Sequence, residues 1–470
     1  MHVSVTLQGR ARVAARVQRL EQKVDQQGGS PRLDRRNRRT WRQMILGVVV
    51  MRSTRLLALG RMVAPQRRAG SVKAAAQGLA YFLQDARVPV SSLSTHLLEE
   101  AIRQIDPDRV VRYTGKALLV LDPTEYEKRS RGRGKCGRQM QYIGRVRRSK
   151  ATRPPKSGKN KARAASRAPQ HSGGPPTGTG ARTATTYGYV DIWAGLALTG
   201  KQFFPLARQL FSSQHPERTS QNVVEEAVLA QALGVLRRVG LDAIVIGDRG
   251  VGRKELIIRL ATQEQDAVLR VDPDITVYPP DAPDGLLLAD ALAQEPWQGE
   301  VAWDRGQQGR LHCRLRTLRA AIRFSRSGRK DDVQEATVTF VEAVPLDGQN
   351  ESLVLATTLK VNTRGQARAV VRLYAQRWSI ATGFETMHAW GQDRFMVRGW
   401  TAIDRLLWVL ALAYALVVLA LYDRTLRRFR DQAVTLLKQL SVVGDDLTVG
   451  KLASLDYQRH QRAWTSAWLH

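Results

Sequence analysis

The order of apolar and polar positions divides the chain into segments of different kinds. From Trp41 to about Ile105, apolar residues recur at helical spacing between basic ones, which predicts a small helical region. From residue 113 to 295, short apolar runs alternate with segments of helical period, and such alternation is typical of an α/β domain. From 296 to 361, several runs alternate apolar and polar residues without helical segments between them, which predicts consecutive antiparallel strands.

Two of the apolar runs end in a carboxylate. The run LLVL precedes Asp122, and the run AIVIG precedes Asp248. Strands that end at the same edge of an α/β sheet bring such side chains together, and two close carboxylates repel unless a cation lies between them. Carboxylate oxygens suit Mg²⁺ or Mn²⁺, and a pair of such ions supports phosphodiester chemistry. An aspartate after a strand can also simply form a turn, so the pair becomes informative only with further features.

A third feature is the segment that begins at Tyr374, which the spacing predicts as one continuous helix. Its polar stripe consists of five residues at three- and four-residue spacing: Tyr374, Arg377, Ala381, Glu385 and His388. The neighbouring stripe is apolar and is expected to face a core: Leu373, Ile380, Phe384 and Met387. A helix with these two stripes can present side chains to a site while its other side packs.

The net charge of the chain indicates what kind of molecule it binds. The 470 residues include 74 Lys+Arg against 42 Asp+Glu, a formal net charge of +32. Such an excess implies a polyanionic partner, most simply nucleic acid held through its phosphates, although a ribosomal-type or merely basic protein is an alternative. From Lys128 to Arg167 there are 16 Lys/Arg and no Asp or Glu, and the segment through Gly180 is rich in Pro, Gly, Ser and Ala. This composition predicts a flexible basic loop that grips phosphates, or else a solvated insertion without function.

The longest apolar run, from Leu406 to Tyr422, has 17 residues without a charge. That length is at the short limit of a membrane span, and the run stands alone in a very basic chain, so we expect a buried core helix rather than a transmembrane one. The two cysteines, Cys136 and Cys313, lie far apart without a zinc-type Cys/His cluster. The N-terminus runs into arginines without an apolar segment. These features predict an intracellular setting.

In combination, the motifs carry a resemblance. The run before Asp122, the run before Asp248, the β-rich segment and then Tyr374-x-x-Arg377-Trp-x-Ile occur in the order found in the DDE cut-and-paste transposases of the insertion-sequence-four group. The chain resembles this group over about residues 40–425. The resemblance implies an α/β fold with a ribonuclease-H-like core and a β-rich insertion, preceded by a small helical DNA-binding domain. The expected divisions are 1–40 (flexible basic arm), 41–112 (helical domain), 113–295 (first part of the core, with a flexible basic loop at 150–182), 296–361 (insertion), 362–425 (last part of the core) and 426–470 (C-terminal region).

The resemblance also implies roles for individual residues. Asp122 and Asp248 would be metal ligands for two Mg²⁺ or Mn²⁺ ions, and Tyr374 and Arg377 would contact phosphates of the transposon end near the scissile bond. Further DNA contacts are expected from His388, Arg249, Lys128, Arg129, Arg131 and Arg133. The implied reaction is cleavage and strand transfer, often through a hairpinned end. The expected partners are double-stranded DNA, namely terminal inverted repeats and target DNA, and a second copy of the chain, with no membrane. The expected location is the cytoplasm of a bacterium, at the nucleoid.

Two positions depart from the pattern of that group. Its signature has Glu and Lys where this chain has Ala381 and His388. An alanine cannot ligate a metal, so the site lacks its third acid. We favour a deliberate inactivating substitution; a naturally decayed or repurposed transposase that still binds DNA is the alternative. A third explanation is that Glu385 serves instead, although it lies about 6 Å further along a helix axis. His388 is either a phosphate contact or an ordinary surface histidine.

These explanations predict different functions. An inactivated transposase would regain metal-dependent cleavage with glutamate at position 381, whereas a repurposed DNA-binding protein would not. A structure-directed nuclease would cut without preference for end sequences. Hairpin chemistry would also use a tryptophan to hold a base outside the duplex. The sequence does not identify that tryptophan; Trp378 is expected in the core, and Trp400 is a guess.

Overall fold

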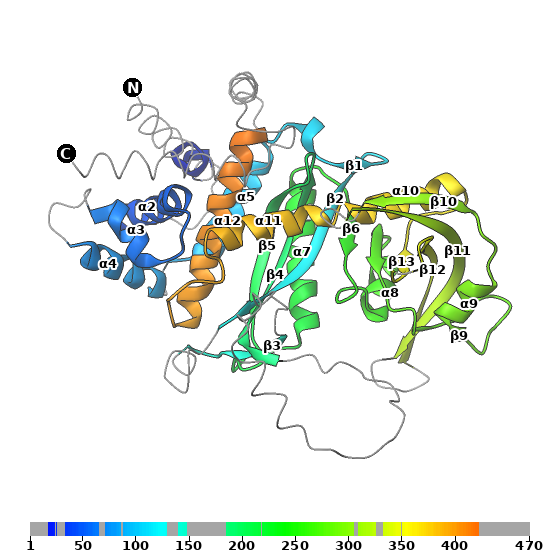
Figure 1. Ribbon diagram of the computed structural model, residues 1–470. Coiled ribbons are helices and arrows are strands. Elements are labelled where there is room, and N and C mark those ends of the chain that lie inside the picture. The colour runs from blue at the N-terminus through cyan, green and yellow to red at the C-terminus, as the bar shows by residue number, and fades with distance from the viewer. Residues whose placement is uncertain are drawn as a thin grey trace, which may run out of the picture.

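The structure is a computed structural model of the chain (Figure 1). It describes residues 17–23, 25, 33–64, 71–85, 88–128, 140–147, 185–217, 219–304, 309–325, 332–348 and 350–422. The helices before the sheet are α2 (Arg35–Met51), α3 (Leu56–Val63), α4 (Val72–Gln84), α5 (Val90–Ile102) and the 3₁₀ turn η2 (Pro107–Arg109). The later helices are α7 (Gln221–Arg238), α8 (Lys254–Thr262), α9 (Leu288–Gln294), α10 (Arg364–Ala375), α11 (Trp378–Ala389) and α12 (Trp400–Tyr422).

Most strands belong to one mixed sheet, which has 11 strands among the described residues. The strands of its first half are β1 (Arg112–Tyr113), β2 (Lys116–Glu127), β3 (Gly144–Arg147), β4 (Thr185–Leu198), β5 (Gln202–Phe211), β6 (Ala243–Gly247) and β7 (Ala267–Arg270). The strands of its second half are β10 (Gly299–Asp304), β11 (Arg310–Ser325), β12 (Val333–Pro345) and β13 (Leu353–Thr357). A separate pair consists of β8 (Thr276–Val277) and β9 (Leu286–Leu287).

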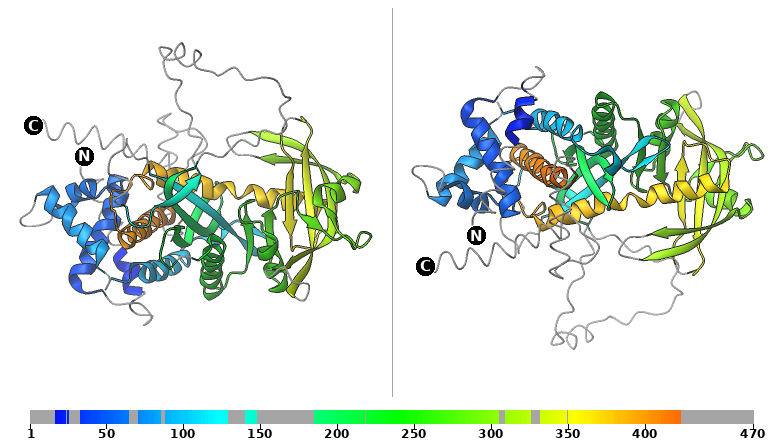
Figure 2. Two further views of the ribbon diagram at one scale, coloured as in Figure 1. Left: turned by 90° about the horizontal axis from the view of Figure 1, so that it is seen from below. Right: turned by 90° about the horizontal axis from the view of Figure 1, so that it is seen from above.

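The sheet is parallel only at its centre. Its order is β10-β11-β12-β13-β7-β6-β2-β4-β3, with β1 beside β2 and β5 beside β4. Strands β2, β6 and β7 run parallel, and the remaining pairs in the sheet are antiparallel. All five residues of β6 are buried, as expected for a central parallel strand covered on both faces. Figure 2 shows α7 and α8 on one face and the line of α10 and α11 on the other.

The strands predicted between 296 and 361 are present and antiparallel, but they do not form a separate layer. Strand β13 pairs with β7 of the core, with Leu355 opposite Arg270, so the insertion extends the central sheet. Three or more strands with a packed face are needed for independent stability, and here they share one hydrogen-bonded ladder with the core.

The helices α2 to α4 lie at the other end of the molecule, against α12 (Figure 1). Helix α12 is long and apolar enough to cross a membrane, and 89% of its most apolar window is buried inside the described protein. It contacts α2, α4, α5 and β5, so its apolar surface is covered by protein, as predicted for a core helix.

Several boundaries differ from the sequence-based ones. Helix α2 begins at Arg35 with Asp34 as its N-cap, so the end of the predicted arm at residue 40 falls inside a helix. Part of the predicted basic loop is ordered, since β3 pairs with β4 through Val146 opposite Thr186. The predicted loop 150–182 and the C-terminal region 426–470 lie outside the described residues.

Candidate active site

Strand register brings the two predicted aspartates together. In the parallel pair of β2 and β6, Leu121 lies opposite Gly247, so Asp122 and Asp248 are the next residues on neighbouring strands. Strand β6 ends there, but β2 does not. It continues to Glu127 through antiparallel pairing with β4, so Asp122 lies within a long strand and not at its end as predicted. The apolar run predicts only the half of β2 that pairs with β6. The second half of β2 pairs with β4, which is distant in sequence, so no local pattern predicts it.

The predicted single helix from Tyr374 to His388 is two helices. Helix α10 ends at Ala375, and α11 begins at Trp378. At the junction the Gln376 amide donates to the Leu373 carbonyl at 3.0 Å and the Arg377 amide donates to the Tyr374 carbonyl at 2.9 Å. These bonds span three residues and tighten the backbone into a 3₁₀ turn. The tightened turn carries Arg377 at the start of α11.

Arg377 joins the two carboxylates. Its Nη1 lies 3.4 Å from Asp122 Oδ2 and 3.6 Å from Asp248 Oδ2, and its side chain is 11% exposed. The Tyr374 hydroxyl donates to Asp248 Oδ1 at 2.8 Å, and the Arg249 amide donates to the same oxygen at 2.8 Å. The structure therefore brings four of the sequence-predicted residues, Asp122, Asp248, Tyr374 and Arg377, to one place.

The two carboxyl groups differ in their tendency to ionise. Burial raises the pKa of Asp122 to about 7, although the Arg377 charge opposes the shift and the charges of Asp248 and Glu225 add to it. Burial also disfavours ionisation of Asp248, but Arg377, the Arg249 amide and the Tyr374 hydroxyl outweigh it and lower the pKa of Asp248. Asp248 is therefore ionised at neutral pH, whereas Asp122 titrates near it.

The two aspartates supply hard oxygen ligands of the kind that suits a divalent cation. Their carboxylates already share the positive charge of Arg377, so the position between them favours a cation. No group of three or more His, Cys, Asp or Glu suited to a metal occurs within the described part of the chain. A two-ion cage would need a further acid beside this pair.

The remaining residues of the predicted stripe lie further along α11. Ala381 is half-buried, Glu385 is exposed and His388 is half-buried. His388 Nδ1 lies 3.9 Å from Asp393 Oδ1, and its ring meets the Tyr126 ring edge-on at 6.1 Å between centroids. Among the described contacts, none joins Glu385 to Asp122 or Asp248, so the structure gives no support to Glu385 as the third acid.

The geometry has a counterpart among known proteins. Residues 207–416 match the family model described as the transposase DDE domain. The match supports a DDE transposase. It covers Asp248, Tyr374 and Arg377, whereas Asp122 lies before its start. Proteins with this domain use divalent metal ions and act on DNA, which agrees with the paired aspartates at the junction of α10 and α11. No curated protein matches the chain.

The basic residues that were predicted to contact DNA have mixed positions. Arg249 lies next to Asp248, but its guanidinium pairs with Glu351, which also lies 3.1 Å from Arg270 Nη2. Lys128 turns inward, donating to the Asp393 carbonyl at 2.7 Å and lying 3.2 Å from the centre of the Phe395 ring. The expectation that Lys128 grips phosphate therefore does not suit its position. Arg129, Arg131 and Arg133 lie outside the described residues.

Some residues around the site were not predicted from the sequence. Arg270 ends the strand β7 beside β6, and its Nη1 lies 3.8 Å from Asp248 Oδ1. Its position after the apolar run AVL is a signal of the kind that identified the aspartates. On α7, Glu225 is 1% exposed and pairs with Arg253, and nothing in its helical spacing indicates that contact.

Beside the junction of α10 and α11 lies a cavity of about 280 Å³. Its basic and aromatic lining residues are Lys201, Arg310, Arg372, Trp303 and Trp378, and Ser379 also lines it. The indole Nε1 of Trp378 and the hydroxyl of Ser379 are buried and make no hydrogen bond in the described structure. The guessed tryptophan, Trp400, lies elsewhere, packed against Tyr142, Tyr189 and His215. Cations, indole rings and unsatisfied donors together suit a nucleotide.

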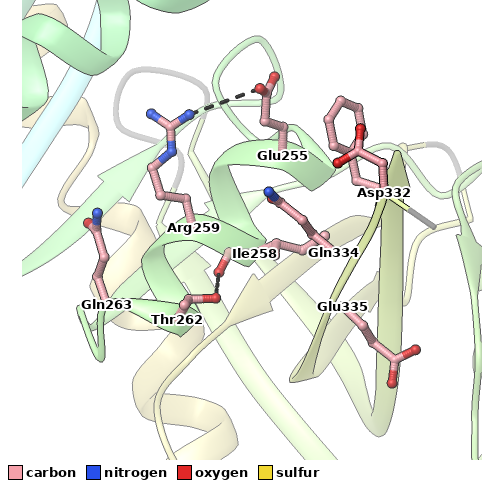
Figure 3. Close-up of a pocket in the computed structure, with 9 residues that line it drawn as sticks. Glu255, Ile258, Arg259, Thr262, Gln263, Asp332, Gln334 and Glu335 are labelled. Carbon is pink, nitrogen blue, oxygen red and sulfur yellow. Dashed lines mark hydrogen bonds and ion pairs between the residues drawn. The ribbon is translucent and has the colours of Figure 1, made fainter. Parts of the chain in front are cut away.

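A larger cavity of about 600 Å³ lies between α8 and the strands β11 and β12 (Figure 3). Its lining arginine, Arg259, is paired with Glu226 and lies 4.0 Å from Glu255. Glu335 on β12 is paired with Arg323, 2.5 Å between Oε2 and Nε. Arg259, the one basic residue among the described residues that line the cavity, is already paired with a carboxylate, so the cavity offers little to a phosphate.

Proposed function

We propose that the chain is a cut-and-paste transposase of the insertion-sequence-four group, which binds the terminal inverted repeats of its own element and transfers them to target DNA. The observation that carries the proposal is the convergence of Asp122 and Asp248 beneath the tyrosine and arginine of the α10–α11 junction. The match to the transposase DDE domain and the net charge of +32 support it.

In this proposal each residue at the junction has a chemical task. Asp122 and Asp248 would hold Mg²⁺ or Mn²⁺, which when bound activates the attacking oxygen and stabilises the leaving one. The Tyr374 hydroxyl fixes the orientation of the Asp248 carboxylate through its 2.8 Å hydrogen bond. The Arg377 guanidinium, once the carboxylates are otherwise neutralised, can turn to the scissile phosphate, for which its planar donors are suited.

The third acid is the point at which this chain departs from the group. We propose that Ala381 leaves the site incomplete and that this sequence is an inactivated form. Glutamate at 381 would lie one helical turn beyond Arg377, on the same stripe and within reach of the junction. The alternative is a naturally inactive transposase-derived DNA-binding protein, which would bind ends without cutting them.

The decisive experiment compares the unchanged chain with Ala381→Glu and with the matched control Ala381→Gln. DNA carrying the terminal repeats that flank the gene is incubated with each protein and Mn²⁺ or Mg²⁺, and cleavage products and end binding are both measured. Cleavage by Ala381→Glu alone supports the inactivated transposase. End binding without cleavage in all three proteins supports the DNA-binding alternative. Neither cleavage nor preference for the repeats would contradict the proposal.

If the unchanged chain already cuts the ends, Ala381 is not a deficiency, and Glu385→Gln decides whether Glu385 contributes. Loss of cleavage in that variant would revive the substitute acid despite its exposed position. Retained cleavage would leave Asp122 and Asp248 as sufficient ligands.

For a hairpinned end, we propose that the 280 Å³ cavity holds the displaced base, between Trp303 and Trp378 and near the cations Arg310 and Arg372. A fluorescent base analogue placed at successive positions of the end would report its removal from the stack. Trp303→Ala should abolish the signal change at one position, whereas Trp400→Ala should leave it intact.

Pairing of ends would require two copies of the chain. We propose a homodimer assembled on two ends, because one copy provides a single pair of site aspartates. Light scattering with and without end DNA tests this: one protomer per end, joined into a two-end complex, is expected, and a monomer on isolated ends would contradict it.

A further inference from the structure

Helix α4 presents an exposed face that the proposed active site does not use. Its buried side packs against α3 and α12 through Ala75, Ala76, Leu79, Phe82 and Leu83. Its outward side is polar and uncovered along the whole helix, and consists of Lys73, Ala74, Gln77, Tyr81 and Gln84. The Tyr81 side chain is 63% exposed, and the Gln77 amide donates to its hydroxyl at 3.1 Å.

Helix α4 is fixed at both ends and along its buried side. The Ser71 hydroxyl caps its first turn by accepting from the Ala74 amide at 3.2 Å. At its other end, the buried Arg405 of α12 donates to the Leu83 carbonyl at 3.1 Å. Gly60 of α3 lies so close that a Cβ there would be 2.7 Å from the Val72 carbonyl oxygen. A binding face on such a rigid helix is more precise than one on a loop.

The helices α2 to α4 lie in a strongly basic segment, although Asp85 is the C-cap of α4. Residues 35–84 contain 11 Lys+Arg and no Asp or Glu. Of these, Arg55, Arg61 and Lys73 are exposed on and beside the α3–α4 pair. These exposed basic residues beside a polar helix face are complementary to the phosphates of a duplex.

We propose that α4 enters the major groove of the transposon end and reads its base sequence through Gln77, Tyr81 and Gln84. This inference rests on the proposed function and assigns end recognition to one helix. The major groove admits an α-helix, and glutamine amides can pair with the donor and acceptor edge of adenine. Lys73, in the first turn, would contact a phosphate and fix the register without reading sequence.

Two other partners fit less well. A protein helix would be expected to bury an apolar stripe, whereas this face offers only Ala74 and the Tyr81 ring between amide side chains. Double-stranded RNA has a deep, narrow major groove that side chains cannot read, so a helix with reading residues favours DNA.

The test uses the full chain and a library of short DNA duplexes with randomised central positions. The unchanged protein is expected to enrich one sequence. Gln77→Ala and Gln84→Ala should each weaken binding to that sequence about tenfold and lose preference at one or two positions, while binding to unselected DNA stays within about twofold. Lys73→Ala should weaken binding to all duplexes alike. It should also reduce the slope of log affinity against log salt concentration by about one. Gln294→Ala, on the exposed side of α9, is the matched control and should change nothing.

The outcomes separate this inference from the proposed function. If the unchanged protein enriches a sequence and the α4 variants enrich it equally well, α4 is not the reader, although end binding stands. If Gln77→Ala and Gln84→Ala weaken selected and unselected duplexes alike, α4 only holds the backbone, and the inference is wrong. If the unchanged protein enriches no sequence or prefers RNA, both the inference and the proposed end recognition fail. Circular dichroism of each variant confirms that α4 remains folded.

Discussion

The Arg377 guanidinium lies where a metal cation would bind between the two aspartates. Its Nη1 lies within 3.6 Å of both aspartates, and its Nε makes no hydrogen bond in the described structure. An acid at position 381 would lie one turn further on the same helix and could pair with this arginine. With alanine there, the guanidinium has the carboxylates of Asp122 and Asp248 as its acidic neighbours. Arg377 and a divalent cation are therefore expected to compete.

Replacing Arg377 with glutamine should separate these effects. Without metal, the Asp122–Asp248 pair loses its counter-charge, and Arg377→Gln should lower the free energy of unfolding by about 2 kcal/mol, less than for a fully buried pair. With Mn²⁺, the variant should bind the ion about tenfold more tightly, since no arginine has to leave. Calorimetric titration and thermal melting with and without Mn²⁺ measure both. Arg372→Gln, exposed on α10, is the control; equal Mn²⁺ affinity in all three proteins would contradict the competition.

The buried ammonium of Lys128 predicts that the stability of the fold depends on pH. Burial lowers the pKa of its ammonium to about 7, although the nearby Asp393 partly opposes the shift. The unfolded chain, with a lysine pKa of about 10.4, then binds more protons than the folded one between about pH 7 and 10. The free energy of unfolding therefore rises with pH through this window, and the stability gained there is lost as the pH falls towards 7. Lys128→Met removes the titration, so the wild type should gain stability relative to Lys128→Met as the pH rises from 7 to 10 in chemical denaturation. A difference independent of pH would show that Lys128 is solvated.

At the scale of elements, one buried ion pair joins β4, β5 and α12. Arg208 of β5 and Asp191 of β4 are both fully buried and lie 2.6 Å apart, and Arg208 Nη1 also lies 2.7 Å from Asp404 Oδ1 of α12. The Tyr126 hydroxyl of β2 donates to Asp191 Oδ2 at 2.7 Å. The network therefore connects the strand that carries Asp122 to the core helix.

Removing one member of this network should be costly. Arg208→Met leaves the Asp191 carboxylate buried without its partner and should destabilise the fold by about 3–5 kcal/mol. The double variant Arg208→Met with Asp191→Asn should recover more than half of that loss, because no buried charge remains. Chemical denaturation of the single and double variants measures the coupling. If the two losses simply add, the pair does not hold these elements together.

Local pattern predicted the elements well and their ends less well. Both aspartates were found because each follows an apolar run, and register then places them side by side. The continuation of β2 past Asp122 depends on β4, more than sixty residues away, so no local signal marks it. Strand β3 was missed within a basic segment, because its order comes from pairing with β4 and not from its composition.

The junction of α10 and α11 is another feature whose end points the sequence pattern could not predict. The three- and four-residue spacing correctly placed Tyr374 and Arg377 on one side, but it could not show that two hydrogen bonds tighten the backbone there. The inward direction of Lys128 likewise depends on carbonyls at Asp393 and Phe395. Spacing predicts which residues share a face, whereas the direction of a long side chain follows from distant partners.

For the whole molecule, the charge of +32 predicts strong dependence of DNA binding on salt. If six to ten phosphates are contacted, affinity for an unselected duplex should fall by about 10³–10⁵ between 50 and 200 mM salt. Fluorescence anisotropy at several NaCl concentrations measures the slope. Ala381→Glu changes the net charge by one near the site and should leave the slope almost unchanged. A shallow slope would show that most of the charge is not used for phosphates.

The pairing of β13 with β7 has a mechanical consequence. Because β13 shares hydrogen bonds with β7, the inserted strands and the core form one continuous sheet among the described residues. The core strand next to the insertion, β7, ends in Arg270, whose Nη1 lies 3.8 Å from Asp248 Oδ1. A displacement of the inserted strands would therefore be passed through β7 to the arginine beside Asp248.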